Sequence, residues 1–377
     1  MKVCDVVLDT VWYDPRVRKQ IVSYLENGVD VVCVGHKDDR YDEEKIKNIP
    51  CPTVITRVDD KYDKRLTSKV KILFREFNRL KYLKKAIIAQ KPDVIHANDL
   101  NTLAACCQAA KKLKCKVVYD SHEICVENHN MKGVYKKLNA LCEKVYIKRI
   151  DKMVCVSHAA ADYFEKKYNI EKPMVITNCC LESDRVLNDE KHEGFEVMMH
   201  GVYYAGRGYD TMVEALPLLK AYPEIKIAMR GFGRIEDELR QRAKELGDEN
   251  MIFYPPVDVS ELIPFASKSA VGVAITENIC INFELSVSNK IFEYAAAGLP
   301  VIMSDIPEHR YLNEKYNFGI ILKENTPECL AEAAIRLYTD KELYNTCAAN
   351  ANKLSEEVNW ENEFSRLIDI ERKWVNG

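Results

Sequence analysis

Short apolar segments alternate with helical segments along most of the chain, and no other feature constrains the fold as strongly. In the first half, β-branched runs such as 2–8, 30–35 and 94–97 are each followed by residues with helical spacing. Parallel strands need crossover connections, usually helices, so this alternation predicts a parallel, doubly wound α/β sheet. The pattern restarts at residue 196 and continues to residue 356. The sequence therefore predicts two Rossmann-like domains.

A polar segment without periodicity separates the two series of elements. Residues 181–195 contain Glu-Ser-Asp-Arg and Asn-Asp-Glu-Lys-His-Glu-Gly, a composition typical of a linker. The length of 377 residues also exceeds that of one ordinary domain. We therefore predict a first domain over 1–180, a linker over 181–195, a second domain over 196–357 and a final segment over 358–377.

Composition favours a soluble protein of the cytosol. The hydrophobic and charged fractions, 47% and 30%, are ordinary for a globular chain. No apolar run approaches the roughly 18 residues that span a bilayer, and residues 1–9 carry aspartates, unlike a signal peptide. The 14 cysteines form no Cys-x-x-Cys pair, so we expect reduced, mostly buried thiols and no metal site.

Charge is distributed unevenly between the two halves. Lys and Arg outnumber Asp and Glu in residues 1–180, and the reverse holds in the remainder. We therefore expect the two halves to meet different partners, or each other.

The stretch Ser-Val-Ser-Asn-Lys-Ile-Phe-Glu-Tyr-Ala-Ala-Ala-Gly-Leu-Pro, residues 286–300, carries the most specific chemical signal. A helix that begins near Ser288 presents unpaired N–H groups and a positive dipole end at Asn289, and Lys290 adds a full charge. Such a helix start suits phosphate. Glu293, about one turn further, can accept hydrogen bonds from a ribose diol. Taken alone, these residue types are also typical of a solvated helix.

Two glycine-containing loops follow strands predicted in the same domain. In residues 200–208 the glycines permit a tight turn, and Arg207 can reach a diphosphate as a bidentate donor. In Met-Arg-Gly-Phe-Gly, Gly231 and Gly233 either approach a ligand or allow close packing of a strand on a helix. All three segments lie at strand-to-helix junctions, so we expect them to converge on one site.

Polar side chains also follow strands of the first domain. His96 and Asp99 lie in Ile-His-Ala-Asn-Asp, and His122 and Glu123 lie in Asp-Ser-His-Glu. A histidine at a strand end can orient a sugar or take part in proton transfer, and it can equally be a packing residue.

The segment from Lys61 to Lys91 has many more basic than acidic side chains, interleaved with residues such as Leu66, Phe77 and Leu83. A basic amphipathic helix is typical of an anchor on anionic lipid, which would place the protein at the inner face of the cytoplasmic membrane. Alternatively, its apolar face packs on the domain and its lysines are solvated. Nucleic acid is a poor candidate partner, because aromatic stacking motifs are absent and the second half is acidic.

The block Lys-Ile-Phe-Glu-Tyr-Ala-Ala-Ala-Gly-Leu-Pro-Val-Ile, with the Arg207-Gly208 loop and Asp-Val-Ile-His-Ala-Asn-Asp, resembles the retaining GT-B glycosyltransferases of family 4. In that family two Rossmann-like domains face each other across a cleft, the second holding a nucleoside diphosphate sugar and the first an acceptor. The resemblance covers nearly the whole chain, including residues 360–374 as a helix that crosses back to the first domain. It implies metal-independent hexosyl transfer, with a UDP-sugar favoured and no other cofactor, to a glycan or lipid-linked acceptor of the cell envelope.

The resemblance also implies roles for individual residues. Glu293 matches the ribose-binding glutamate, and Arg207 and Lys290 would stabilise the leaving diphosphate. The remaining donor-side candidates are Ser288, Asn289, Asn282, Gly231 and Gly233. The acceptor side would contain the candidate catalytic histidines His96 and His122, together with Asp14, Arg16, Asp99 and Glu123. Asp14 and Arg16 can equally be charges at a helix start, with Pro15 at the first helical position.

Two departures from the family pattern leave other functions open. Leu285 stands where the family has its first glutamate, with Glu284 one place away, and Val202 stands where an arginine is expected. A non-hydrolysing sugar-nucleotide epimerase shares the architecture, and so does a nucleotide- or carbohydrate-binding protein without catalysis. A dinucleotide oxidoreductase is disfavoured, because Trp-Tyr-Asp-Pro replaces Gly-x-Gly-x-x-Gly after the first strand.

Overall fold

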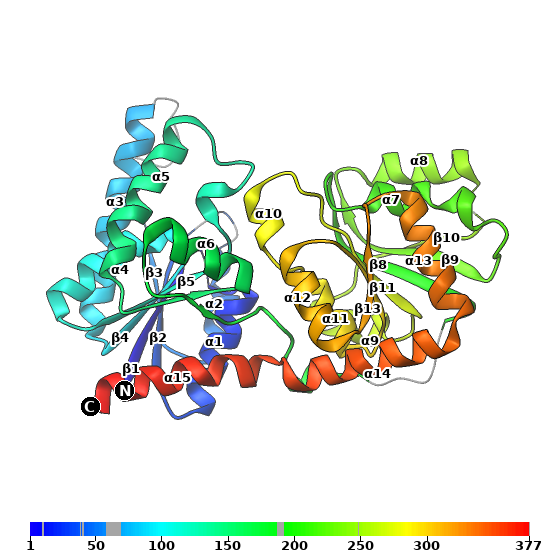
Figure 1. Ribbon diagram of the computed structural model, residues 1–377. Helices are drawn as coiled ribbons and strands as arrows, with labels where there is room; N and C mark the ends of the chain where they lie inside the picture. The colour runs from blue at the N-terminus through cyan, green and yellow to red at the C-terminus, as the bar shows by residue number, and fades with distance from the viewer. Residues whose placement is uncertain are drawn as a thin grey trace. The chain divides into compact units, whose positions relative to one another are not determined.

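The computed structural model describes residues 1–9, 11–37, 39, 41–57, 69–186, 192–247 and 249–376, with the backbone alone for residues 69–75. The chain divides into two compact units (Figure 1). Unit 1 contains Met1–Thr177 and Glu363–Gly377, and unit 2 contains Asn178–Asn362. Residues 187–191 of the predicted linker lie outside the described residues. The chain therefore passes into unit 2 at residue 178 and returns to unit 1 at residue 363.

Unit 1 is built on one parallel sheet of seven strands in the order β3-β2-β1-β4-β5-β6-β7. The strands are β1 (Lys2–Val6), β2 (Asp30–His36), β3 (Thr53–Thr56), β4 (Val94–Asn98), β5 (Lys116–Ser121), β6 (Lys152–Cys155) and β7 (Met174–Val175). Right-handed crossovers fix the face on which each connecting helix lies. One face therefore carries α3 (Lys69–Gln90), α4 (Leu100–Leu113), α5 (Gly133–Tyr146) and α6 (His158–Tyr168). The other carries α1 (Pro15–Glu26) and α2 (Glu43–Lys47).

Unit 2 repeats the architecture with a parallel sheet of six strands in the order β10-β9-β8-β11-β12-β13. The strands are β8 (Phe195–Tyr203), β9 (Ile225–Gly233), β10 (Met251–Tyr254), β11 (Val271–Ala274), β12 (Val301–Ser304) and β13 (Gly319–Leu322). The helices are α7 (Tyr209–Glu214), α8 (Glu236–Leu246), α9 (Val259–Ala266), α10 (Ile281–Leu285), α11 (Asn289–Ala296), α12 (Pro307–Tyr316), α13 (Pro327–Thr339) and α14 (Lys341–Glu357). The last helix, α15 (Trp360–Asn376), begins in unit 2 and ends in unit 1.

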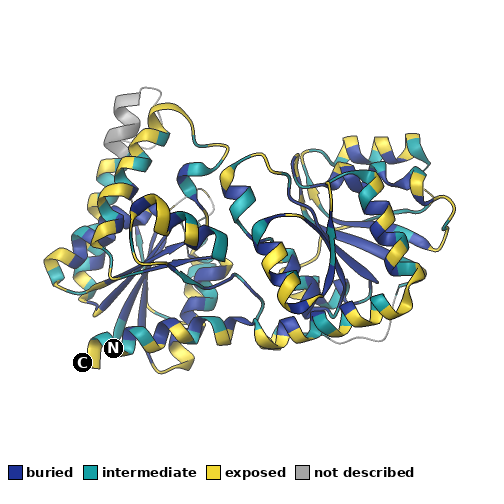
Figure 2. Ribbon diagram, in the orientation of Figure 1, coloured by how far each residue is buried: buried dark blue, intermediate teal, exposed yellow. Residues whose placement is uncertain are grey.

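Each sheet is buried on both faces, as its continuous apolar strands require. Figure 2 shows the buried residues concentrated in the strands of both units. The cysteines are all free thiols, and each is buried or partly buried. Within the described residues, no helix is both long and apolar enough to cross a membrane.

The predicted fold class is confirmed, since both units have the doubly wound parallel sheet. Individual caps also follow the sequence: the Ser157 hydroxyl accepts a hydrogen bond from the Ala160 N–H at 3.0 Å and begins α6. The sequence analysis missed α2, β3, α10 and β13, which have four or five residues each, and also α12, which begins at Pro307. Segments of four or five residues hold too few apolar positions to show a period.

Strands β8 and β9 continue into the two glycine-containing segments that the sequence analysis took for loops, and glycine is the reason. Gly201 pairs with Gly231, and Tyr203 pairs with Gly233. A Cβ atom on Gly231 would lie 1.9 Å from the carbonyl oxygen of Gly201, and one on Gly233 would lie 2.1 Å from that of Tyr203. Because the obstacle is backbone, no side chain can be accommodated without moving a strand.

We predict that Gly231→Ala destabilises the protein far more than the control Gly247→Ala. Both glycines have positive φ, +151° and +91°, but a Cβ on Gly247 meets nothing within 4 Å. The control should lose ~1 kcal/mol from backbone strain, and Gly231→Ala ~2–4 kcal/mol because strand β8 must also move. Thermal denaturation of both variants measures the difference. Equal midpoints would show that the two strands do not constrain residue 231.

Candidate functional site

The candidate donor site lies in unit 2, where the order of strands reverses. Strand β8 is central: β9 follows it on one side and β11 lies on the other. Ligands of doubly wound sheets bind beyond the carboxyl ends of the strands at such a point. His200 and Gly201 lie in the carboxyl-terminal half of β8, and α11, which carries Lys290 and Glu293, packs against β11.

A buried histidine holds the predicted ribose-binding glutamate. The Nε2 atom of His200 lies 2.6 Å from Oε2 of Glu293. The His200 side chain is 2% exposed and that of Glu293 is 25% exposed, so the carboxylate stays accessible to a ligand. Hydroxyls of two tyrosines fix the His200 backbone: its N–H donates to Tyr294 at 3.1 Å, and its carbonyl accepts from Tyr209 at 3.1 Å. The position of Glu293 is therefore set by strand β8 as well as by its own helix.

Lys290 extends from α11 across the backbone of β8. A Cβ atom placed on Gly201 would lie 3.5 Å from Cε and 3.6 Å from Nζ of Lys290. Burial lowers the pKa of the Lys290 amine to about 8, the Glu293 carboxylate opposes this shift, and Arg207 adds to it. At neutral pH the amine is therefore mostly charged, and it titrates just above that range.

Arg207 is the second cation of this cluster. Its guanidinium carbon lies 4.2 Å from the ring centroid of Phe283 and 5.3 Å from that of Tyr204. Its Nε atom is buried and has no hydrogen-bond partner among the described residues. The positive charges of Lys290 and Arg207 thus repel each other, while the Glu293 carboxylate attracts Lys290. A bound anion would relieve that repulsion and satisfy the buried donor.

The other predicted donor-side residues occupy different environments. Ser288 is the N-cap of α11, and its N–H donates to Nε2 of His309 at 3.4 Å. Burial lowers the pKa of His309 to about 4, so the neutral ring accepts there and donates from Nδ1 to the Ser304 carbonyl at 3.0 Å. Asn289 is exposed at the start of the helix, whereas Asn282 is buried in α10.

Gly231 and Gly233, predicted either to approach a ligand or to allow close packing, have a clear packing role in the structure. Both lie inside β9 and permit its close pairing with β8. They therefore correspond to the packing alternative, although the close contact joins two strands and not a strand and a helix.

In unit 1, the predicted residue Arg16 forms a buried ion pair. Its Nε and Nη2 atoms lie 2.9 and 3.0 Å from the two carboxylate oxygens of Asp120. The side chains are 3% and 0% exposed, and Gln20 donates to the same carboxylate at 2.8 Å. Burial alone would raise the pKa of Asp120, but Arg16 and His122 hold it well below its usual range. The Arg16 guanidinium is thus held in the interior of unit 1, and its role toward an acceptor stays a prediction.

Asp14 caps the helix in front of Arg16. Its side chain accepts hydrogen bonds from the N–H groups of Arg16 at 3.0 Å and Val17 at 3.1 Å, and Pro15 occupies the first helical position. Asp14 therefore acts as the cap of helix α1, which fits the alternative interpretation of a charge at a helix start.

His96 is fully buried within β4, two residues before the end of the strand. Its Nδ1 atom is 2.9 Å from the Tyr24 hydroxyl, which donates to Glu371 of α15 at 3.0 Å. Its Nε2 atom is 3.4 Å from Asp120. With an exposed fraction of 0%, His96 fits the packing alternative, and its catalytic role stays a prediction.

His122 and Asp99 lie at the carboxyl ends of β5 and β4, with 17% and 32% of their side chains exposed. Nδ1 of His122 is 3.5 Å from Asp99, and Nε2 is 3.2 Å from the Asn98 amide oxygen. Burial would lower the pKa of His122, but Asp99 and Asp120 raise it to about 9. The ring is therefore a cation at neutral pH, which can donate a hydrogen bond but cannot accept a proton. Glu123 is exposed beside it.

Backbone strain accompanies these residues. Val11 has a φ of +66°, which a β-branched residue rarely adopts, and Asp99 combines a φ of +62° with a ψ of 163°, outside the left-handed helical region that Asp tolerates. They follow β1 and β4, the two strands at which the order of the first sheet reverses. Strained residues cluster at functional sites, which supports this edge as the candidate site of unit 1.

His200 and Asp120 are the residues that sequence reasoning missed. Each is the first residue of a stretch that was examined, residues 200–208 in one case and Asp-Ser-His-Glu in the other, but was assigned no role. Their partners lie 93 and 104 residues away in the chain. The only local signal is a polar residue at the end of an apolar run.

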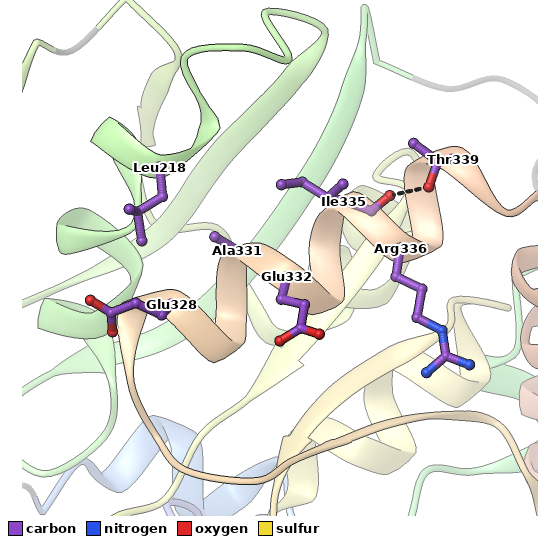
Figure 3. A pocket seen from close by; sticks show the side chains of 7 residues that line it. All are labelled: Leu218, Glu328, Ala331, Glu332, Ile335, Arg336 and Thr339. Carbon is purple, nitrogen blue, oxygen red and sulfur yellow. Dashed lines mark hydrogen bonds between the residues drawn. The ribbon is translucent and has the colours of Figure 1, made fainter.

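A separate shallow pocket of about 540 Å³ lies on unit 2 between η5 (Leu216–Leu219) and α13. Figure 3 shows that Leu218 lies opposite the helix, while Glu332 and Arg336 project from its other side. Also lining it are Glu328, Ala331, Ile335 and Thr339. It contains none of the candidate site residues.

Comparison with known proteins assigns both halves of the chain. Residues 20–184 match the family described as Glycosyltransferase Family 4, and residues 194–340 match Glycosyl transferases group 1. A Klebsiella pneumoniae protein described as an uncharacterized 42.6 kDa protein in the cps region is 24% identical over 255 residues. An uncharacterized glycosyltransferase of Methanocaldococcus jannaschii is 21% identical over 248 residues. Each alignment includes 62% of this chain, which spans 61% of the length of either relative.

Solved structures share the fold at low sequence identity. Sucrose-phosphate synthase of Thermosynechococcus elongatus gives a TM-score of 0.76 at 15% identity, covering 100% of this chain and 99% of that one. Anabaena HepE, solved with UDP and glucose, gives 0.73 at 14% identity, covering 99% of both chains. The pneumococcal O-GlcNAc transferase GtfA, solved with UDP and GlcNAc, gives 0.74 at 10% identity, covering 100% and 99%. The chain has the GT-B fold and belongs to the family 4, group 1 glycosyltransferases.

Proposed function

We propose that the protein moves a hexosyl group from a nucleoside diphosphate sugar, with a UDP-sugar favoured, to a saccharide or lipid-linked acceptor. The reaction retains the anomeric configuration, needs no metal ion and belongs to cell-envelope polysaccharide synthesis. It takes place in the cytoplasm or at the inner face of the cytoplasmic membrane. The observation that carries the proposal is the grouping of Glu293, Lys290 and Arg207 at the strand reversal of unit 2.

The three side chains match the parts of a nucleoside diphosphate. Glu293, held by His200 and 25% exposed, accepts hydrogen bonds from the ribose hydroxyls. Lys290 and Arg207 bind the diphosphate, and the N–H groups at the start of α11 add the positive end of its dipole. The excess of positive charge would remain unbalanced without such an anion.

The same cations explain how transfer proceeds without a metal. The bond between the anomeric carbon and the phosphate oxygen breaks, and its electron pair leaves with the diphosphate. Lys290 and Arg207 stabilise that developing charge, a contribution that commonly dominates catalysis. A bond forms from the acceptor oxygen to the anomeric carbon, and the acceptor proton passes to the departing phosphate. His122, already protonated, donates hydrogen bonds and is not the base.

Relatives support the choice of donor and of pathway. Two structural neighbours, HepE and GtfA, were solved with UDP and a sugar. One sequence relative is described by its place in a cps region, and another structural neighbour is a lipopolysaccharide outer core galactosyltransferase. An acceptor of the cell envelope is therefore the natural choice. Turnover of a UDP-sugar in the absence of any acceptor would instead indicate an epimerase.

We predict that Glu293→Ala weakens UDP binding about 10–100-fold, because hydrogen bonds to a charged group contribute ~1.5–3 kcal/mol each. Calorimetric titration measures the change, with Glu328→Ala on α13 as a control that should bind like the wild type. The wild type should also bind 2′-deoxy-UDP more weakly than UDP, whereas Glu293→Ala should bind the two nucleotides with similar affinity. If Glu293→Ala bound both nucleotides with wild-type affinity, the ribose assignment would be wrong.

We predict that UDP affinity falls about tenfold between pH 7 and 9, because the amine of Lys290, with a pKa of about 8, then loses its charge. The phosphates of UDP, whose last pKa is about 6, do not titrate in this range. Lys290→Arg should make the affinity nearly independent of pH, since a guanidinium stays charged. A profile unchanged by this substitution would exclude Lys290 from the phosphate site.

A further inference from the structure

Helix α5 of unit 1 has an exposed apolar face. Its members are Val134, Tyr135, Leu138, Leu141 and Val145, with exposed fractions of 67%, 56%, 46%, 58% and 39%. Four of them follow one another at intervals of four, three and four residues, so they lie on one side of the helix. Single exposed apolar residues are ordinary, but five along a helix of 14 residues form a contiguous patch. Such a patch indicates a surface that meets a partner.

Every exposed charged residue of helix α5 is a lysine, and the exposed Asp151, which follows the helix, is paired with Lys116 at 2.8 Å. The helix contains one acidic residue, Glu143, which is buried and accepts hydrogen bonds from the hydroxyls of Tyr119 and Tyr168. The exposed charged residues of α5 and of its immediate flanks are Lys132, Lys137, Lys144, Lys148 and Arg149. Whatever covers the α5 face therefore has apolar and negatively charged groups together.

Helix α3 lies in the segment that the sequence predicted as a membrane anchor. It combines exposed apolar residues with basic ones only in part. Residues 61–68 lie outside the described residues, and Leu83 and Ile87 of α3 are fully buried, so this side of α3 packs on the domain. Phe77 and Tyr82 are 66% and 37% exposed. Both α3 and α5 pack against α4 in the same layer of helices (Figures 1 and 2). The membrane interpretation is therefore better supported at α5 than at α3.

We propose that the α5 face binds an anionic lipid bilayer. Aliphatic side chains and a tyrosine enter the boundary between head groups and acyl chains, and the flanking lysines and arginine contact the lipid phosphates. The helix, with 14 residues, is too short to span the membrane and lies in its surface. A second copy of the chain fits less well, because two such faces would bring like charges together.

The α5 face is connected to the candidate acceptor side of the same unit. The helix begins 11 residues after His122, and Lys136 in its first turn bonds Glu127 of the intervening loop at 2.8 Å. A lipid-linked acceptor emerging beside α5 would therefore lie close to the edge formed by His122 and Asp99. This step rests on the proposed function, whereas the lipid-binding surface itself does not.

Vesicle binding by the full chain tests the proposal. The vesicles contain either phosphatidylcholine alone or phosphatidylcholine with phosphatidylglycerol. One double variant, Leu138→Gln with Leu141→Gln, removes apolar area, and another, Lys137→Glu with Lys144→Glu, reverses charge. The matched control, Leu218→Gln with Val259→Gln, changes apolar residues of unit 2 that are 42% and 74% exposed. All six altered positions are exposed, so thermal denaturation of each variant should match that of the wild type.

The wild type and the control should bind the anionic vesicles and not the neutral ones. Each α5 variant should lose at least about tenfold in partition coefficient. The proposal is overturned if the wild type ignores anionic vesicles at low salt, or if both α5 variants bind like the control. It is also overturned if the wild type self-associates without binding vesicles and the double variant Leu138→Gln with Leu141→Gln no longer self-associates. UDP binding, measured on the same proteins, stays unchanged in each case and separates this result from the donor-site proposal.

Discussion

The donor site depends on the close approach of β8 and β9, which only glycine allows. A Cβ atom on Gly231 would collide with the backbone of Gly201, and one on Gly201 would lie 2.9 Å from the Tyr209 hydroxyl. The bare backbone at Gly201 gives Lys290 its path across the strand, and the same segment of β8 carries His200 to Glu293. Two candidate ligand-binding side chains, Lys290 and Glu293, are thus positioned through the same segment of β8.

Unit 1 is organised by a buried ion pair instead of a glycine contact. Arg16 and Asp120 join α1 to the end of β5, and Gln20, His96 and His122 extend the network. Breaking such a pair leaves a buried charge unsatisfied, which costs several kcal/mol, about 3–5. The network also keeps His122 protonated beside Asp99. Buried residues of the sheet thereby determine the charge of His122, which is partly exposed, whereas His96 is not.

The sequence was sufficient for the fold class because alternation of strand and helix is a local and repeated signal. It was also sufficient for Glu293 and Lys290 as neighbours, since they occupy adjacent turns of one helix. It was not sufficient for His96 or Arg16, whose residue types suggested chemistry while burial assigns them to the interior. Burial of a polar residue depends on partners such as Tyr24 and Asp120, which lie 72 and 104 residues away.

The apolar face of α5 was missed for the opposite reason. Its pattern of Val134, Leu138, Leu141 and Val145 has the spacing of any helix that packs on a core, and only the structure shows that this side faces outward. Periodicity identifies an amphipathic helix but does not identify what its apolar side contacts.

A crystal structure of the full chain with bound UDP would test the central claim most directly. The account predicts the diphosphate within hydrogen-bonding distance of Lys290 and Arg207, and the ribose hydroxyls on the Glu293 carboxylate. Nucleotide bound elsewhere, for example in the pocket beside α13, would contradict it. So would a ribose that points away from Glu293 while the diphosphate occupies another surface of unit 2.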